Sequence, residues 1–422
     1  MANMMDYLLW RGDLSLAQAP WCNVDSLVMA SFCYIKMGEL PADDEISLHD
    51  LALTLPLMEQ EGSVQFRQWR SLFYAMADSR RYGSMVLHDY VDITNTEEAT
   101  QFSAVTCDLE DGTAFVCFRG TDSTLVGWRE DFDMSYSSPV PAQTMASEYL
   151  SRMIAQTGKK IRTSGHSKGG NLAAYAAAHL TEQEQQQLIS VCSFDGPGLD
   201  DITLASDGYK RILPILTSVI PESSVVGLLM GYSENYTVVE AESVSLLQHD
   251  AFKWHLRGPD FMPAELNASS RIIDEALHTW LKEESVEDRK MLVEAMFEIA
   301  ESTKAETVAD FKKDILTKLS AIVSAHQNMD PEKKKNAQQL LGRILSLSAS
   351  TAWDSLKDRV RDTVGEAGSK VRDTIGGVGS TLRDTVEEAG KNVIRRIRQG
   401  DEAPEEDSKP DDAPKGIVGE GE

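Results

Sequence analysis

The sequence predicts an α/β fold, with a mostly parallel sheet and helices on both faces, followed by a C-terminal helical region and a disordered acidic tail. The first observation is a β-compatible segment at 160–164 that leads through glycines into a run at 171–180 without a helix breaker. The second is that sharp polar turns follow two other apolar, strand-like segments, at 113–118 and 191–194. A chain of 422 residues with 42% hydrophobic residues exceeds one ordinary domain and supports a real core.

The glycine-rich segment between the first strand and its helix has the pattern Gly-x-Ser-x-Gly, formed by Gly165, Ser167 and Gly169. A serine becomes accessible there only if the strand turns into the helix within a few residues, which strains the backbone and tolerates no bulk beside it. The amide of Lys168 would then lie at a helix N-terminus, where N–H groups bind a developing oxyanion. This context predicts an α/β-hydrolase fold with Ser167 as its nucleophile, although small residues around a serine also occur in plain tight turns. Arg162 is unexpected in a buried strand.

A serine nucleophile needs a histidine base, which in this fold follows it in the chain after an acid. The histidines downstream are His179, His249, His255, His278 and His326. We call the Gly-x-Ser-x-Gly turn at 165–169 the elbow and the helix after it the elbow helix. His179 lies along that helix, roughly 18 Å from its start, which is too far for it to reach the serine. His249 follows the strand-like segment 236–239 and a short connection, so it is the preferred base, with His255 second. The alternative for His249 is a surface or helix-capping residue.

The orienting acid has two main candidates. Asp195 begins the sharp turn 195–198 after a buried strand, at the carboxyl edge of the sheet where α/β sites assemble. Its alternative role is an Asx turn. Glu222, after the apolar stretch 212–220, is the second candidate, and Asp200 and Asp207 follow.

Upstream, the apolar strand at 113–118 stops at Arg-Gly-Thr-Asp, residues 119–122. A glycine turn before the elbow is the expected source of the second oxyanion amide. The competing interpretation is a simple hairpin turn.

Three segments, 118–122, 127–132 and 165–170, together resemble the fungal-type class 3 lipases. The chain resembles still more closely a little-characterised bacterial family of lipase-like hydrolases, marked by a Gly-His-Ser-Lys-Gly-Gly-Asn elbow. The likeness covers roughly residues 1–282 and includes the segments 6–13, 193–198 and 248–254. It implies that Ser167 is the nucleophile, His249 the base, and Thr121 with Lys168 the oxyanion pair.

Two departures from the lipases weigh against a triglyceride substrate. Lys168 replaces the apolar residue usual after the serine, and the acid does not fall in an Asp-Pro-Val context. A lysine beside the nucleophile would attract anionic head groups or carboxylates, or point to solvent. Exposure to solvent is the expectation we favour.

The net charge of −26 argues against nucleic-acid substrates. Five cysteines without paired close spacing indicate buried thiols rather than disulfides or a zinc site. No secretory signal is visible, and the apolar stretch 212–232 is too interrupted to span a bilayer. We therefore expect a cytoplasmic protein whose contact with a membrane, if any, is peripheral. We also expect that it needs no metal or organic cofactor.

The C-terminal third has a different character. Apolar stripes at helical spacing over 283–350 predict a helical bundle or interaction domain. Residues 351–400 contain a repeat of period 11, in which Val-Arg-Asp-Thr at 360–363 recurs at 371 and in related form at 382. Its narrow apolar face suits an amphipathic helix on a membrane, self-association as a right-handed coil, or a disordered segment. The acidic tail at 401–422 is expected to be disordered.

These features predict that residues 1–282 form a serine esterase for lipid-type esters that acts through Ser167, His249 and Asp195. Two other functions stay open. The fold would serve as a silent scaffold that acts through its helical tail, or the same triad would cleave thioesters or peptides.

Overall fold

The computed structural model describes residues 1–38, 45–55, 64–122, 125–230, 236–242 and 245–267, and isolated residues between 270 and 294. The predicted repeat helix at 351–400, the tail at 401–422, almost all of the helical region 283–350, and His278 and His326 lie outside the described residues.

An eight-stranded sheet forms the centre of the protein, and its strand order follows the chain. Strands β1 to β4 are antiparallel neighbours, whereas β4 to β8 are all parallel. The sheet, with helices around it, confirms the predicted α/β-hydrolase fold. The strands are β1 (Ile46–Ser47), β2 (Val86–Asn95), β3 (Thr100–Asp108), β4 (Ala114–Phe118), β5 (Ile161–His166), β6 (Leu188–Phe194), β7 (Leu216–Pro221) and β8 (Tyr236–Val239). A small hairpin, β9 (Leu256–Arg257) and β10 (Asp260–Phe261), follows.

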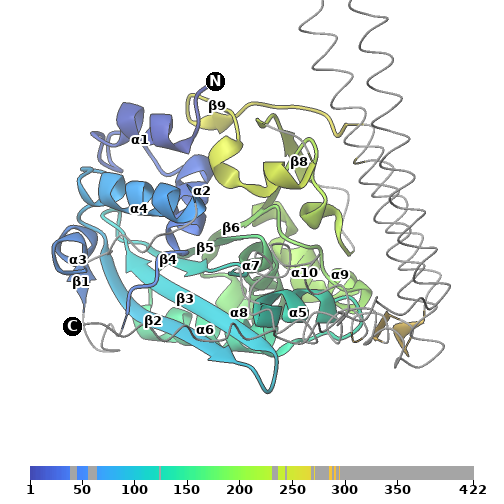
Figure 1. Cartoon of the computed structure of the whole chain (residues 1–422). Helices are drawn as coiled ribbons and strands as arrows, with labels where there is room; N and C mark the ends of the chain where they lie inside the picture. Colours follow the sequence, from blue (N-terminus) through green and yellow to red (C-terminus); the bar gives the residue numbers. More distant parts are fainter. Residues whose placement is uncertain are drawn as a thin grey trace, which may run out of the picture.

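Helices cover both faces of this sheet (Figure 1). Parallel strands in sequential order, joined by right-handed connections, place their crossover helices on one face. These are α6 (Pro141–Thr157), α7 (Lys168–His179), α8 (Glu182–Gln185), α9 (Asp201–Ala205) and α10 (Asp207–Ile212), and α5 (Leu125–Asp133) precedes them. The opposite face is covered by α1 (Met4–Arg11), α2 (Asn23–Phe32), α3 (Leu48–Thr54) and α4 (Val64–Ala77).

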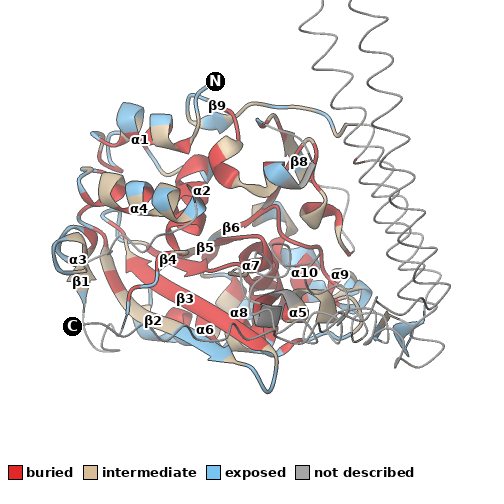
Figure 2. Ribbon diagram, in the orientation of Figure 1, coloured by how far each residue is buried: buried red, intermediate tan, exposed pale blue. Residues whose placement is uncertain are grey.

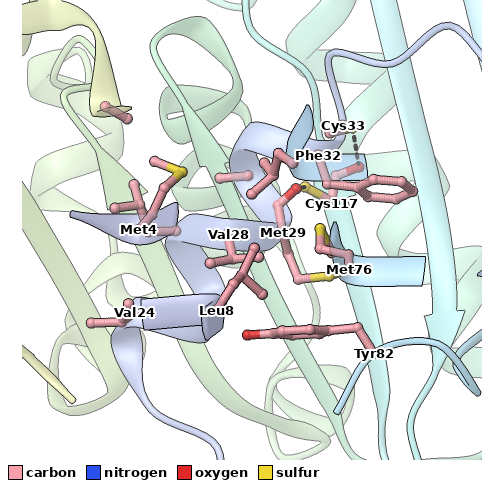
Figure 3. Packing of buried hydrophobic residues seen from close by; sticks show 14 of the residues in the cluster. Met4, Leu8, Val24, Val28, Met29, Phe32, Cys33, Met76, Tyr82 and Cys117 are labelled. Carbon is pink, nitrogen blue, oxygen red and sulfur yellow. Dashed lines mark hydrogen bonds between the residues drawn. The ribbon is translucent and has the colours of Figure 1, made fainter. Parts of the chain in front are cut away.

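The central strands are buried on both sides, as Figure 2 shows. Strand β4 illustrates the alternation: Phe115 and Cys117 pack with the N-terminal helices, while Val116 and Phe118 pack with α6 and α7. Successive side chains of a strand point to opposite faces, so an uninterrupted apolar run is what a sheet covered twice requires. Figure 3 shows the core on the N-terminal side, where Cys33 also donates a hydrogen bond to the backbone of Cys117.

The N-terminal helices are tied together by a fully buried ion pair between Arg81 and Asp25, with 2.6 Å between Nη2 and Oδ2. The Asp25 carboxylate also accepts hydrogen bonds from the hydroxyls of Tyr7 and Tyr82. Arg81 in turn donates to backbone carbonyls of the loop between α1 and α2, including that of Ala19. Every charge in this cluster therefore has partners, which is the condition under which buried charges are tolerated.

Arg162, unexplained by the sequence, lies near the start of β5 rather than in the core. Its guanidinium is 3.2 Å from the carboxylate of Asp111 and lies over the ring of Trp21. The cysteines Cys33, Cys107, Cys117 and Cys192 are buried, and burial raises the pKa of the Cys107 thiol well above its usual range. The apolar stretch 212–232 supplies β7, and among the described residues no helix is long and apolar enough to cross a bilayer.

Candidate active site

The turn between β5 and α7 has the strained backbone that its glycines suggested. Ser167 has φ 58° and ψ −133°, and its amide donates to the carbonyl of Phe194 at 2.9 Å. A positive φ is uncommon for a residue with a side chain, and such strain persists only where the surroundings enforce it. Ser167 lies at the end of a central strand and caps the N-terminus of α7.

The two glycines of the motif are required by close backbone approaches. A Cβ atom on Gly165 would overlap the backbone of Gly169, and one on Gly169 would overlap the carbonyl of Phe118 at the end of β4. The elbow therefore packs directly on its own helix and on the neighbouring strand. Any larger residue at either position would displace Ser167.

His249 and Asp195 are brought together, although 54 residues separate them in the chain. His249 ends a 3-10 helix, Ser245–His249, and its Nδ1 lies 2.6 Å from Oδ2 of Asp195. Because a carboxylate only accepts, the ring carries its proton on Nδ1 when neutral, and Nε2 is left as an acceptor. Asp195 is almost fully buried, and the side chain of His249 is 26% exposed.

The other oxygen of Asp195 is held by the loop after β7. Oδ1 accepts from the hydroxyl of Ser224 at 2.5 Å and from the amide of Gly227 at 3.0 Å. A Cβ atom on Gly227 would overlap this same oxygen, so only glycine brings its amide so close. Neither residue was predicted from the sequence. The only signal for them is that their loop follows β7, the strand next to β6 in the sheet.

The other candidates for acid and base are engaged elsewhere. Glu222 accepts a hydrogen bond from the side-chain amide of Gln248 at 3.2 Å. His255 bonds to Glu240, and His179 bonds to the carbonyl of Tyr175 on its own helix. Asp200 caps the helix α9, and the side chain of Asp207 is exposed beside Lys210.

His166, the residue before Ser167, connects the elbow to the turn that carries His249. Its Nε2 lies 2.7 Å from the backbone carbonyl of His249, and its Nδ1 lies 3.0 Å from the hydroxyl of Tyr34. Since a carbonyl only accepts, Nε2 carries the proton and Tyr34 donates to Nδ1. Burial lowers the pKa of His166 to about 3, and the neighbouring His249 adds to that shift. His166 is therefore a neutral, fixed link at pH 7.

The turn after β4 lies against the elbow. A Cβ atom on Gly120 would overlap the hydroxyl of Tyr34 and would lie 3.1 Å from Cβ of Ser167. The hydroxyl of Thr121 donates to Oδ2 of Asp131 at 2.5 Å, which fixes the next residue of this turn to α5. Burial raises the pKa of Asp131 to about 6, even though the nearby Lys168 opposes this shift.

The expectation that Lys168 points to solvent is wrong. Its side chain is fully buried, and Nζ donates to Oε2 of Glu130 at 2.8 Å and to the carbonyl of Gln101 at 2.9 Å. The long alkyl chain of lysine reaches an internal carboxylate that a sequence window around the serine does not reveal. An internal ion pair also leaves this ammonium unable to serve as a surface site for anionic head groups.

Asn171, one turn into α7, ties the elbow to the turn that bears Asp195. Its side-chain amide donates to the carbonyl of Gly198 at 2.6 Å, and its oxygen accepts from Gln143 at 2.9 Å. Three residues around Ser167 thus connect it to other segments: His166 to the turn of His249, Lys168 to the helix α5, and Asn171 to the turn of Asp195.

This arrangement is suited to nucleophilic acyl transfer. It combines a strained serine at a helix N-terminus, an imidazole oriented by a buried carboxylate, and a glycine turn beside the serine. Among the described residues, no group of three or more His, Cys, Asp or Glu side chains is arranged to hold a metal ion.

Comparison with known proteins adds a family and a set of distant structural relatives. Residues 76–298, more than half of the chain, match the sequence model of the Mbeg1-like family. None of the curated proteins matches the chain. The solved structure of M37 lipase is similar at 16% identity with a TM-score of 0.32, over 48% of this chain and 69% of that one. The Rhizomucor miehei lipase–propeptide complex is similar at 14% identity with a TM-score of 0.31, over 52% and 92% of the two chains.

A fungal lipase–inhibitor complex is similar at 15% identity with a TM-score of 0.25, over 36% of this chain and 66% of that one. At such identities and TM-scores these likenesses carry no statement about activity or substrate.

Proposed function

The chain belongs to the Mbeg1-like family, and we propose that it is a serine hydrolase that cleaves carboxylic esters of lipid type through an acyl-enzyme. The observation that carries the proposal is the 2.6 Å hydrogen bond between His249 and Asp195, beside a serine with positive φ. Strained serines and histidine–carboxylate pairs each occur in structural roles. Here both lie at the carboxyl edge of one sheet, and His166, next to Ser167, bonds to the carbonyl of His249, which supports acyl transfer.

In the proposed reaction, Nε2 of His249 takes the hydroxyl proton of Ser167 while Oγ attacks the ester carbonyl carbon. The tetrahedral intermediate collapses, the bond to the leaving alcohol breaks, and the imidazolium gives its proton to that alcohol. A water molecule, deprotonated by the same histidine, then attacks the acyl carbon. The bond from that carbon to Oγ of Ser167 breaks, the imidazolium returns its proton to Oγ, and the acid is released. Asp195 holds the tautomer and stabilises the imidazolium.

The amides of Thr121 and Lys168 are the proposed oxyanion donors. Lys168 is the first residue of α7, and the first amides of a helix lack intrahelical acceptors. Gly120 packs against Ser167, so the turn that holds Thr121 is next to the nucleophile. A preorganised donor of this kind contributes about 3 kcal/mol to transition-state stability.

One exposed apolar side chain beside the proposed base is compatible with lipid-type esters. Leu247, two residues before His249 in the same turn, is 60% exposed. The resemblance to class 3 lipases points the same way, whereas the buried Lys168 provides no recognition of a charged head group.

The direct test is labelling of the purified protein with a fluorophosphonate probe, which reacts with activated serines. We expect labelling of the wild type and none of Ser167→Ala or His249→Ala. His255→Ala is the matched control, since that histidine lies nearby in the sequence but bonds to Glu240. Equal labelling of the Ser167→Ala variant would refute the assignment of the nucleophile.

A second pair of variants separates the two acids. Asp195→Asn should lower kcat on p-nitrophenyl butyrate about 10⁴-fold, because the amide favours the wrong histidine tautomer. Glu222→Gln should stay close to wild type, since Glu222 contacts Gln248 instead. The opposite ranking would exchange their roles.

The two other functions are outcomes of the same experiments. A folded wild-type protein that no fluorophosphonate labels would favour a silent scaffold. A labelled protein that cleaves acyl-CoA thioesters or peptides faster than esters of matched acyl chain would replace the substrate class but keep the triad.

A further inference from the structure

Resting on the function proposed above, we propose that Lys168 is a positioning residue whose buried ammonium holds Thr121 in place as an oxyanion donor. Its Nζ lies 2.8 Å from Oε2 of Glu130 and 3.8 Å from Oδ1 of Asp131. Both carboxylates belong to α5, the helix that follows the turn of Thr121. One cation next to the nucleophile therefore organises the segment across from it.

A first route runs from the ammonium to the side chain of Thr121. Asp131 accepts the Thr121 hydroxyl on Oδ2 and turns Oδ1 towards Lys168. Oδ1 is buried and has no hydrogen-bond partner, so the ammonium is the charge that compensates it. Burial raises the pKa of Asp131, and Lys168 opposes that shift more strongly than the Thr121 hydroxyl or His249 does.

A second route runs through Gln101, the second residue of β3. Its carbonyl accepts from Nζ of Lys168, and its amide donates to Oε2 of Glu130 at 3.0 Å. Its side-chain oxygen accepts from the amide of Asp122, the residue after Thr121, also at 3.0 Å. The turn is therefore held at Thr121 and at Asp122 by groups that touch Lys168 or its partners.

Glu130 anchors the whole arrangement to the core. Its Oε1 accepts from the amide of Ala142 at the start of α6, and its side chain is 1% exposed. Gly127 keeps α5 close, since a Cβ atom there would lie 2.6 Å from both Cγ2 of Thr121 and the side-chain oxygen of Gln101.

Stability alone does not account for this ion pair. Burying a lysine and a glutamate costs desolvation that their attraction barely offsets, and an apolar pair of similar size is often at least as stable. The buried charge of Lys168 is better explained by the position that it gives to the Thr121 turn. Displacing a catalytic group by about 1 Å costs about 100-fold in rate, so the accuracy of the Thr121 amide matters far more to catalysis than to folding.

The test compares hydrolysis of p-nitrophenyl butyrate with that of its thiono ester, in which sulfur replaces the carbonyl oxygen. Sulfur accepts hydrogen bonds poorly, so the oxo-to-thiono ratio of kcat reports how well the donors meet the oxyanion. The main variant is Lys168→Met with Glu130→Gln, which removes both buried charges together. We expect kcat for the oxo ester to fall about 10- to 100-fold, KM to change less than about threefold, and the ratio to fall with kcat.

Lys168→Arg, which keeps the cation, should retain more of the ratio than the double variant. The control is Lys159→Met with Asp108→Asn, which removes a partly exposed ion pair. That ion pair lies at the end of the sheet away from Ser167, where Asp108 pairs with Ala114, the first residue of β4. Its loss should leave the oxo-to-thiono ratio unchanged.

A fall in kcat with an unchanged ratio would show only a loss of folded protein and would overturn the inference, as would an unchanged kcat. If the wild type shows neither hydrolysis nor labelling, the proposed function itself fails and this inference with it. If the wild type is active and the double variant has the same oxo-to-thiono ratio, only the positioning role of Lys168 fails.

Discussion

The side chain of His166 donates a hydrogen bond to the backbone carbonyl of His249, with 2.7 Å between Nε2 and the oxygen. The residue before the proposed nucleophile thereby fixes the position of the turn that carries the proposed base. The bond uses only groups of the protein, so the two parts of the site are held in register before a substrate arrives. Such preorganisation removes reorganisation from the reaction step.

His166 should make folding sensitive to acid. Its pKa is lowered to about 3 in the folded protein from the usual 6.5. Between pH 6.5 and pH 3 this histidine is therefore protonated in the unfolded chain but neutral in the folded protein. The stability it contributes is complete above pH 6.5 and is lost as the pH falls towards 3, at most about 5 kcal/mol. Urea unfolding of His166→Gln at pH 7, 5 and 4 should give a flatter decline than wild type. Parallel declines would contradict the assignment.

Gly227 should be indispensable to the acid. A methyl group there would overlap Oδ1 of Asp195, so we expect Gly227→Ala to lower kcat about 10- to 100-fold by displacing the carboxylate from His249. The control is Gly112→Ala. Gly112 has φ +79° but open space around its Cβ direction, so its substitution should cost only about 1 kcal/mol of stability and leave kcat unchanged. Equal kcat values for the two variants would refute this role of Gly227.

The ion pair between Arg81 and Asp25 should be a main determinant of stability on the N-terminal side. Asp25→Asn removes the countercharge of a guanidinium that is fully buried, which should cost about 3–5 kcal/mol of unfolding free energy. Urea unfolding at pH 7 measures this. Asp207→Asn, which removes an exposed partner of Lys210, is the control and should produce no measurable change. A loss for Asp25→Asn no larger than the control's would show that the cluster is not needed.

For the 11-residue repeat we propose a peripheral contact with lipid. Deleting residues 351–422 should abolish flotation with liposomes and leave hydrolysis of short esters intact, because the repeat carries the amphipathic pattern and the site lies within 1–282. Deleting only 401–422 removes the acidic tail but keeps the repeat, and flotation should persist. Unchanged flotation after the longer deletion would exclude the membrane interpretation.

The fold and the strained glycine turn around Ser167 were predictable because their signals are local. Gly165, Ser167 and Gly169 lie within five residues of one another, and the backbone approaches that exclude larger side chains there are made by the elbow itself and the next strand. The buried strands were equally visible, since a sheet covered on both faces demands continuous apolar runs such as β4.

The acid was a different kind of problem. Asp195 and Glu222 both follow apolar, strand-like segments, so the local pattern left the two open. Their side chains diverge in the folded protein, because Ser224, Gly227 and His249 surround the first and Gln248 binds the second. None of these contacts is encoded in the spacing of either carboxylate.

The sequence by itself determined the α/β-hydrolase class, the glycine turn around Ser167 and a short set of candidate residues, because periodicity and glycine spacing act over a few residues. Only the tertiary structure decided which carboxylate meets His249 and where Lys168 points. The reason is that a buried charge needs a countercharge, and tertiary contacts decide where that countercharge lies. The partner of Lys168, Glu130, lies 38 residues away in the chain and 2.8 Å away in space.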